Sequence, residues 1–176
     1  MNNNASSKTS LFLMELIIAI FFFSISAAIC VRLFVSAHTL AEKTVNLNNA
    51  VTWSQNLAEC FNSEKGDIEK IADYYPSTFV SEDTLILFFD DNWEIMDGSL
   101  TKASYEAILV TKKEAAKEVY SDIREYQSYI DGMAICGDIY IIDVKGQSDV
   151  ITAVSEDYEN IILSDKVDVY LGKESH

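Results

Sequence analysis

The sequence predicts an α+β protein in which a long N-terminal helix precedes an antiparallel β-sheet and packs on it. No glycine or proline occurs between Leu11 and Asn62, so nothing in this stretch breaks a helical backbone. Beyond Pro76 the pattern changes to short apolar runs separated by turns rich in Asp, Asn and Gly. Connections of hairpin length favour antiparallel pairing, and a helix packed on such a sheet gives the α+β class.

The predicted helix includes a long apolar segment with a single charge. The 21 residues from Leu11 to Val31 contain one charged side chain, that of Glu15. At ~1.5 Å per residue this helix is roughly 30 Å long, enough to cross the hydrocarbon core of a bilayer. A carboxylate at its centre costs about 2.5–3.5 kcal/mol on insertion scales. Because the segment holds no Lys or Arg, the partner of Glu15 must come from outside this helix.

The first fifteen residues follow a specific order. A polar leader, Met1 to Ser10, precedes the apolar Leu11, and Glu15 stands five places into the apolar run. This order resembles the N-terminus of type IV pilins and pseudopilins. The resemblance implies that prepilin peptidase cleaves between Ser10 and Leu11 and methylates the new amino terminus of Leu11. The family's usual residue before the cleaved bond is glycine, and this chain has Ser10 there. The resemblance also gives Glu15 a partner, the terminal ammonium of a neighbouring subunit, since paired charges are tolerated where single ones are costly.

The resemblance implies a structural role and no enzymatic activity or cofactor. The expected function is that of a minor pilin or pseudopilin subunit in a type II secretion or type IV pilus-like filament. Expected partners are prepilin peptidase, other pilin or pseudopilin subunits, an inner-membrane assembly platform and membrane lipid. The leader is expected in the cytoplasm and the C-terminal domain outside the cell membrane, in a filament or at the cell surface after assembly. The expected parts are a leader (1–10), a transmembrane segment (11–35), an amphipathic continuation of the helix (36–62) and an acidic globular domain (63–176).

Three other interpretations of the apolar segment compete with this one. A secretory signal peptide would have its apolar core from Leu16 and its cleavage site at Ser26-Ala27-Ala28, yet the apolar character continues past that site. A lipoprotein signal ending at Cys30 is disfavoured because Ile29 stands where a small residue is needed. A plain signal anchor would hold a single-pass extracellular binding module that does not polymerise. None of the three explains the acidic residue in the segment.

The net charge of −15 lies in the second part of the chain. Residues 1–62 hold three acidic and three basic side chains, whereas residues 63–176 hold 25 acidic and 10 basic ones. Such a domain is repelled by nucleic acid, so no direct nucleic-acid binding is expected. Charge does not fix the orientation in a membrane, because Lys8 precedes the span while Arg32 and Lys43 follow it.

After the span, one apolar stripe continues along the helix. Its nine positions alternate in steps of four and three: Leu33, Ala37, Leu40, Thr44, Leu47, Val51, Ser54, Ala58 and Phe61. All of them except Thr44 and Ser54 are apolar. We expect Leu40, Leu47, Val51 and Phe61 to pack on a sheet face that includes Ile135, Ile139 and Ile141. The alternative, an independent coiled coil, is weaker because small and polar residues interrupt the seam.

The remaining elements follow from local signals. Gly66 ends the long helix, Asp67 caps a short second helix on which Ile68, Ile71, Ala72 and Tyr75 share a face, and Pro76 stops it. A capping box at Thr111 to Glu114 predicts a helix that continues to Ile130, although residues 118–125 also alternate like a strand. Strands are predicted at residues 85–89, 93–96, 104–111, 133–144, 150–154 and 167–171, with turns at Asp90-Asp91-Asn92, Asp97-Gly98 and Lys145-Gly146-Gln147.

Groups that could carry chemistry are few. The two histidines, His38 and His176, are far apart in sequence, and no glycine-rich phosphate loop is present. One turn gathers oxygen ligands suited to a hard cation: Asp90, Asp91, Asn92, Glu94 and Asp97. Their spacing does not match an EF-hand, and a solvated hairpin is the favoured interpretation over a cation site. Cys30 lies in the span, while Cys60 and Cys136 either form a disulfide that links helix and sheet or remain free thiols.

Overall fold

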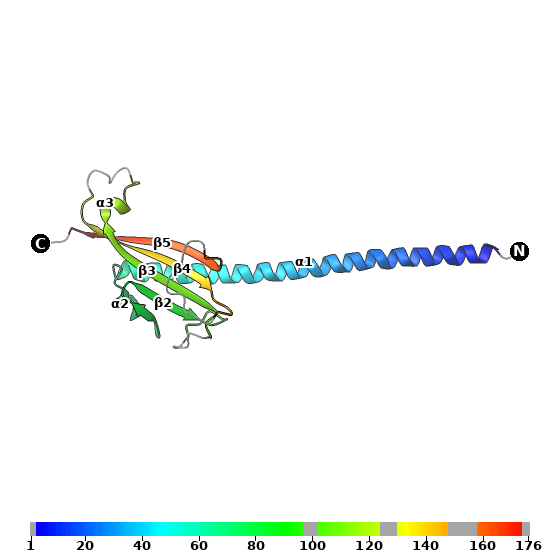
Figure 1. Cartoon of the computed structure of the whole chain (residues 1–176), viewed down its shortest axis with the longest axis horizontal. Coiled ribbons are helices and arrows are strands. Elements are labelled where there is room, and N and C mark those ends of the chain that lie inside the picture. Colours follow the sequence, from blue (N-terminus) through cyan, green and yellow to red (C-terminus); the bar gives the residue numbers. More distant parts are fainter. Residues whose placement is uncertain (1–2, 97–101, 124–129, 148–157, 174–176) are drawn as a thin grey trace. The chain divides into compact units, whose positions relative to one another are not determined.

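The computed structural model describes residues 3–96, 102–123, 130–147 and 158–173 (Figure 1). The chain divides into two compact units, Met1–Val45 and Asn46–His176. The predicted turn at Asp97-Gly98 and the predicted strand at 150–154 lie outside the described residues. The elements in chain order are α1 (Asn3–Ser63), α2 (Ile68–Ala72), β1 (Phe79–Ser81), β2 (Thr84–Phe89), β3 (Tyr105–Ala115), α3 (Ala116–Val119), β4 (Met133–Asp143) and β5 (Ile161–Gly172).

The strands form one antiparallel sheet with the order β1-β2-β3-β4-β5, so each strand pairs with its neighbour in sequence (Figure 1). The β3–β4 pair is the longest uninterrupted ladder and runs from Tyr105 opposite Asp143 to Ala115 opposite Met133. β2 is buried on both faces, which fits its unbroken apolar sequence from Leu85 to Phe89. The predicted α+β class, a long helix with an antiparallel sheet, is therefore confirmed, and the arrangement is pilin-like.

The C-terminal end of α1 stops in a Schellman turn. The N–H of Gly66 donates to the carbonyl oxygen of Phe61 at 2.8 Å, and the N–H of Lys65 donates to that of Asn62 at 3.4 Å. Lys65 and Gly66 have φ angles of 54° and 74°, in the left-handed region. A Cβ on Gly66 would lie 2.7 Å from the Ile135 side chain, so glycine is needed here for space as well as conformation.

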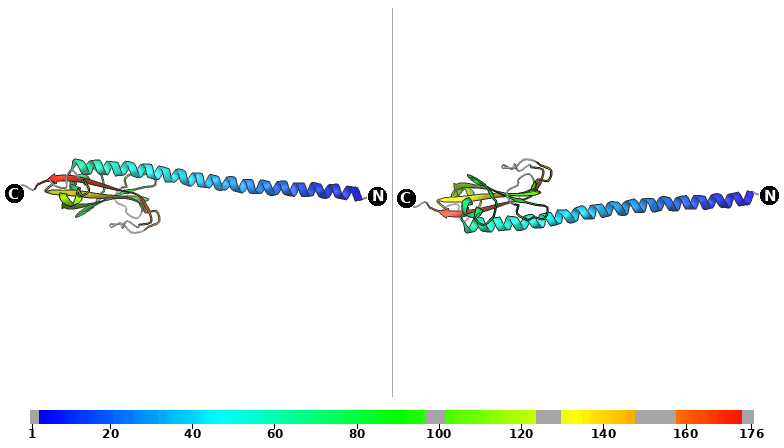
Figure 2. Two further views of the ribbon diagram at one scale, coloured as in Figure 1. Left: turned by 90° about the horizontal axis from the view of Figure 1, so that it is seen from above. Right: turned by 90° about the horizontal axis from the view of Figure 1, so that it is seen from below.

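The part of α1 in the second unit packs along one face of the sheet (Figure 2). Phe61 is fully buried, and its ring lies where a Cβ on Gly137 of β4 would come within 2.8 Å of it. The predicted contact of Phe61 with the sheet face of Ile139 and Ile141 is thus confirmed. The buried core on this face comprises Ala50, Leu57, Phe61, Ile68, Ile71, Leu85, Leu87, Phe89, Trp93, Tyr105, Ala107, Leu109, Ile139 and Ile141, with Ile135 packed against it.

The prediction of which α1 residues pack on the sheet is wrong for the N-terminal part of the predicted row. Leu40, Leu47 and Val51 are 67%, 44% and 37% exposed and do not belong to the buried core. The buried row instead comprises Ala50, Ser54, Leu57 and Phe61, with Asn46 and Trp53 partly buried. The predicted row repeats every 3.5 residues, and a straight α-helix drifts ~20° per heptad against that period. The two rows therefore agree at Phe61 and Ser54 and diverge toward the N-terminus.

The opposite face of the sheet carries a second apolar cluster. It comprises Ile86, Phe88, Ile108, Tyr140, Ile142 and Val144, with Met96, Ala103, Val110, Tyr158 and Ile161 packed against it. Because neighbouring residues of a strand point to opposite faces, Ile139 and Ile141 face α1 while Tyr140 and Ile142 face away from it. The same parity decides the position of Cys136, as described below.

Two predicted elements are wrong. Residues 93–96 form no strand but a single bridge between Ile95 and Phe89, because Trp93 adopts a φ of 64° that breaks the extended backbone. The predicted helix after Thr111 is replaced by strand as far as Ala115, and the helix that follows, α3, ends at Val119. The backbone pairing of residues 111–115 with β4 outweighs the local capping signal there. Residues 124–129 of this predicted helix lie outside the described part of the chain.

Candidate functional site

The candidate site lies in the first unit, on the apolar part of α1. Large side chains along this part are exposed, including Leu11 at 65% and Phe23 at 76%. Within the described residues, one helix is long and apolar enough to span a membrane or to act as a signal, by length and composition. None of its most apolar stretch is buried within the chain. These side chains therefore need an apolar environment from outside the chain.

The serines of this part of α1 satisfy their own hydroxyl groups. Ser24 Oγ donates to the Ile20 carbonyl oxygen at 2.8 Å, and Ser26 Oγ donates to that of Phe22 at 2.9 Å. A hydroxyl bonded to its own helix can enter an apolar environment without leaving a donor unpaired. The serines thus need no external partner.

The Glu15 carboxylate, unlike these serine hydroxyls, has no hydrogen bond within the described part of its own helix. No hydrogen bond or ion pair joins its carboxylate to another described side chain, and the residue is exposed on α1. Leu11 lies four residues earlier, about one helical turn or ~6 Å along the axis. Ser10 and Leu11 both lie inside α1, which begins at Asn3, before the predicted cleavage position. The structure thus places Glu15 one turn from the terminus that cleavage would create.

Searches against protein-family models, curated proteins and solved structures found no match to this chain. The pilin-like architecture therefore stands on the elements themselves, the long apolar N-terminal helix and the antiparallel sheet.

Asn46 joins α1 to the sheet through hydrogen bonds that the sequence did not predict. Its Oδ1 atom accepts from Trp93 Nε1 at 3.3 Å and from the Tyr105 hydroxyl at 3.0 Å. The Trp93 and Tyr105 rings stack with centroids 4.0 Å apart, and Trp53 of α1 lies 4.6 Å from Phe89. These contacts fix the first turns of the helix that touch the sheet. A sequence signal existed, because Asn46, Ala50, Trp53 and Leu57 recur at helical spacing.

Lys145 and Asp91 close this aromatic cluster at the surface. Lys145 Nζ lies 4.8 Å above the Tyr105 ring and 3.0 Å from Asp91 Oδ1. Hydrogen bonding to Tyr105, and to a smaller extent to Asp91, raises the pKa of Lys145. Hydrogen bonds from Lys145 and from the Ser104 hydroxyl, the latter at 2.9 Å, lower the pKa of the Asp91 carboxyl. Asp91 thus has partners within the chain.

The acidic turn acts as a hairpin closure in the structure. Asp90 Oδ1 accepts the backbone N–H groups of Asn92 at 2.8 Å and of Glu94 at 3.0 Å. The hydrogen bond from Glu94 is the main reason that the pKa of Asp90 is lowered. Among the described residues, no group of three or more His, Cys, Asp or Glu side chains is arranged to hold a metal ion. Asp97, the fifth member of the predicted cluster, lies outside those residues.

The structure contains no Cys60–Cys136 disulfide, and all three cysteines are free thiols. Cys60 Sγ lies 3.3 Å from the Tyr75 hydroxyl, on the side of the sheet that α1 covers. Cys136 has the parity of Tyr140 and therefore points to the opposite face, between Lys112 and Asp168 of the flanking strands. The sheet itself separates the two sulfur atoms, and the free-thiol alternative describes the structure.

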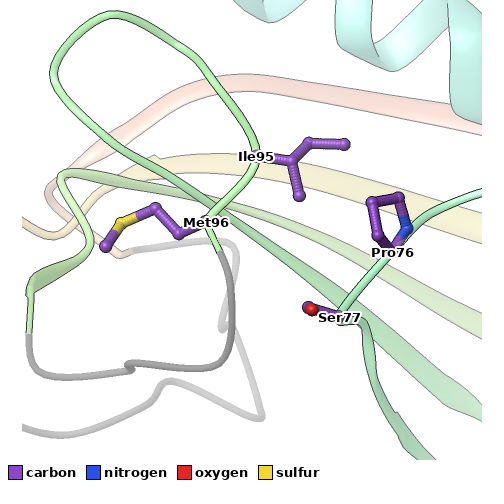
Figure 3. Close-up of a pocket in the computed structure, with 4 residues that line it drawn as sticks. All are labelled: Pro76, Ser77, Ile95 and Met96. Carbon is purple, nitrogen blue, oxygen red and sulfur yellow. The ribbon is translucent and has the colours of Figure 1, made fainter.

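Surface hollows among the described residues differ in the side chains that line them. One of them is lined by Glu64, Lys70, Asp73 and Tyr74. Another, of about 200 Å³, lies between the segment before β1 and the residues that bridge to β2 (Figure 3). The described residues that line it are Pro76, Ser77, Ile95 and Met96, none of which is acidic or basic. His38 is exposed on α1, and His176 lies outside the described residues.

Proposed function

We propose that this protein is a pilin-type subunit, a minor pilin or pseudopilin of a type II secretion or type IV pilus-like filament. In this proposal α1 holds the subunit in the membrane, prepilin peptidase cleaves between Ser10 and Leu11, and assembly occurs through α1. The observation that carries the proposal is Glu15, a lone charge in an apolar segment with no partner among the described side chains.

The electrostatics of Glu15 favour a partner from another subunit. Cleavage before Leu11 would create an ammonium group four residues from Glu15. A second, parallel helix shifted by ~6 Å along its axis would bring its own terminal ammonium level with this carboxylate. A broken buried pair costs about 3–5 kcal/mol, so the pairing would select this stagger over others.

The rest of α1 is consistent with such an assembly. The serine hydroxyls of the apolar segment are satisfied locally, so Glu15 is the one side chain there that requires a charged partner. Leu47 and Val51 are apolar and exposed on the part of α1 that packs on the sheet, and a neighbouring helix could cover them. These features support helix-to-helix assembly better than a bitopic binding module, which has no use for Glu15.

Intact-mass and N-terminal analysis of the membrane-extracted protein tests the proposal. In a host with a prepilin peptidase, we expect a mature chain that begins at Leu11 with a methylated amine. Ser10→Gly should be cleaved at least as completely, whereas Ser10→Leu should accumulate uncleaved, because the peptidase accepts a small residue there. A terminus at Ile29 would indicate a signal peptide, and an uncleaved wild-type chain would indicate a signal anchor. Either result would contradict the proposal.

A further inference from the structure

β5 forms one edge of the sheet, and no strand in the described part of the chain pairs with its outer side (Figure 1). The strand at the opposite edge, β1, has three residues, whereas β5 has 12. Natural proteins commonly protect an edge from pairing with another chain by short strands, prolines or bulges. β5 contains no proline, and its register with β4 skips only Ile162 and Leu171, near its two ends. The stretch from Leu163 to Tyr170 is therefore regular and long enough to pair with another strand.

Two opposite charges flank Val167, the residue near the middle of this stretch. Lys166 precedes Val167 and Asp168 follows it. If two β5 strands pair antiparallel about Val167, Lys166 of each copy lies directly opposite Asp168 of the other. Opposite charges directly across two strands stabilise their pairing, and like charges destabilise it. An axis at Lys166 or at Asp168 would set like charges against each other, so the sequence favours the register about Val167.

Both charges are accessible for such a contact. Lys166 Nζ lies 3.6 Å from Asp138 Oδ1, and 71% of the Lys166 side chain is exposed. Asp168 is exposed and is hydrogen-bonded to the Tyr120 hydroxyl. Because a carboxylate can accept about four hydrogen bonds, Asp168 can keep this contact and accept Lys166 of a second copy. Asp165, the third charge of the stretch, already accepts a hydrogen bond from the Ser54 hydroxyl at 3.0 Å.

The pairing also fixes how the part of α1 in the second unit would lie. Along β5, Ser54 lies at Asp165, and Phe61 lies further on, at Gly137 opposite Val167. This part of α1 thus runs in the same direction as β5. A two-fold axis through the Val167 pair would leave both helices on the same face of the joined sheet, in opposite directions. The contact is confined to the second unit and differs from the parallel helix contact of the proposed function.

We propose that the outer edge of β5 is an interaction surface for a second copy of this chain, paired antiparallel about Val167. The net charge of −15 opposes other contacts between copies, so the local match of charges decides where two copies meet. A contact of one strand edge is small, and a weak, reversible dimer is expected. The inference does not rest on the proposed function.

Charge reversal on the full chain in detergent tests the register, with sedimentation measuring the monomer–dimer equilibrium. Lys166→Asp and Asp168→Lys should each weaken dimerisation by about tenfold, because two opposite-charge pairs become like-charge pairs. The double variant should recover most of the loss. Lys117→Asp, at an exposed lysine on α3, changes the net charge as Lys166→Asp does and should dimerise like wild type. If only net charge mattered, Asp168→Lys would strengthen dimerisation, and that result would overturn the inference.

A disulfide trap tests the same register without altering a charge. In the full chain with serine in place of its three cysteines, Val167→Cys and Val169→Cys are compared under mild oxidation. Directly opposite residues have Cα atoms about 4.5–5.5 Å apart, within the span of a disulfide, so Cys at 167 should cross-link to itself. Two copies of residue 169 would lie about 13 Å apart along the strands and should not. A monomeric wild type, or equal cross-linking at both positions, would overturn the inference and leave the proposed function standing.

Discussion

The two parts of α1 differ in where their apolar side chains find partners. Beyond Asn46, the buried row of Ala50, Leu57 and Phe61 packs on the sheet of the same chain. Before Val45, residues such as Leu11 and Phe23 are exposed along the helix. One continuous helix, Asn3–Ser63, thus serves two environments, one supplied by the chain and one that must come from outside. Stability of the second unit and the proposed assembly through the first should therefore respond to different mutations.

The largest effect on stability is expected at Phe61. Truncation of a fully buried phenylalanine typically lowers the free energy of unfolding by about 3–5 kcal/mol, so Phe61→Ala should do so here. Leu47→Ala, a truncation on the exposed face of the same helix, should change it by less than about 0.5 kcal/mol. Denaturant unfolding of the full chain in detergent measures both, with fluorescence from Trp53 and Trp93, the two tryptophans of the sequence. Equal losses in the two variants would show that the contact row is misplaced.

A smaller effect is expected at Asn46. Asn46→Ala removes the acceptor of the Trp93 and Tyr105 hydrogen bonds and leaves two buried donors without it. An unsatisfied buried donor costs about 1–3 kcal/mol, so the loss should fall in that range or slightly above it. Asn46→Asp keeps an acceptor oxygen at the same place and should lose less. If the two variants unfold alike, the hydrogen bonds do not hold the helix on the sheet.

Some of the elements behind these expectations could be predicted from the sequence, and others could not. The helix, its end at Gly66, the Asp67 cap and the strands β2 and β4 were predictable, because strong periodicity and backbone-specific residues act locally. The strand at residues 111–115 was not, because its pairing with β4 is a non-local interaction that overrides a local cap. The φ of 64° at Trp93 was hidden for the same reason, since the Tyr105 ring that stacks on Trp93 belongs to β3.

The candidate site was more accessible to sequence reasoning than the contacts of the fold. Glu15 is conspicuous because a charge in an apolar run is costly wherever the run is placed. The position of Cys136 could also have been deduced. If Ile135, Ile139 and Ile141 face α1, period-two alternation puts Cys136 on the other face, away from Cys60. Helical spacing with Ala50, Trp53 and Leu57 could have placed Asn46 on the buried face of α1, but its partners Trp93 and Tyr105 could not be deduced, because they are distant from it in sequence.

The smallest stability effect concerns the acidic turn and its pH dependence. Hydrogen bonds from Lys145 and Ser104 hold the pKa of Asp91 below its ordinary value of 3.8. A lowered folded-state pKa stabilises the fold above pH 3.8, and this contribution disappears as the pH falls through the folded-state pKa. Asp91→Asn should therefore be less stable than wild type at neutral pH, and the difference should shrink below about pH 4. The control Glu82→Gln, at an exposed acid between β1 and β2, should show no such convergence.

The proposed pilin-type function depends most directly on Glu15. Glu15→Ala and Ser24→Ala each remove a polar group from the apolar part of α1, but Ser24 is satisfied within its own helix. Both variants should insert and remain stable, and loss of the carboxylate should ease insertion by about 2.5–3.5 kcal/mol.

With the machine intact, sheared surface filaments or secretion should be measured beside the membrane level of the subunit. Ser24→Ala should assemble like wild type. Glu15→Ala should lose incorporation by about a hundredfold or more, since each unpaired terminus would cost about 3–5 kcal/mol in the filament core. Full assembly of Glu15→Ala at a normal membrane level would contradict the pilin-type function and favour a membrane-anchored binding module.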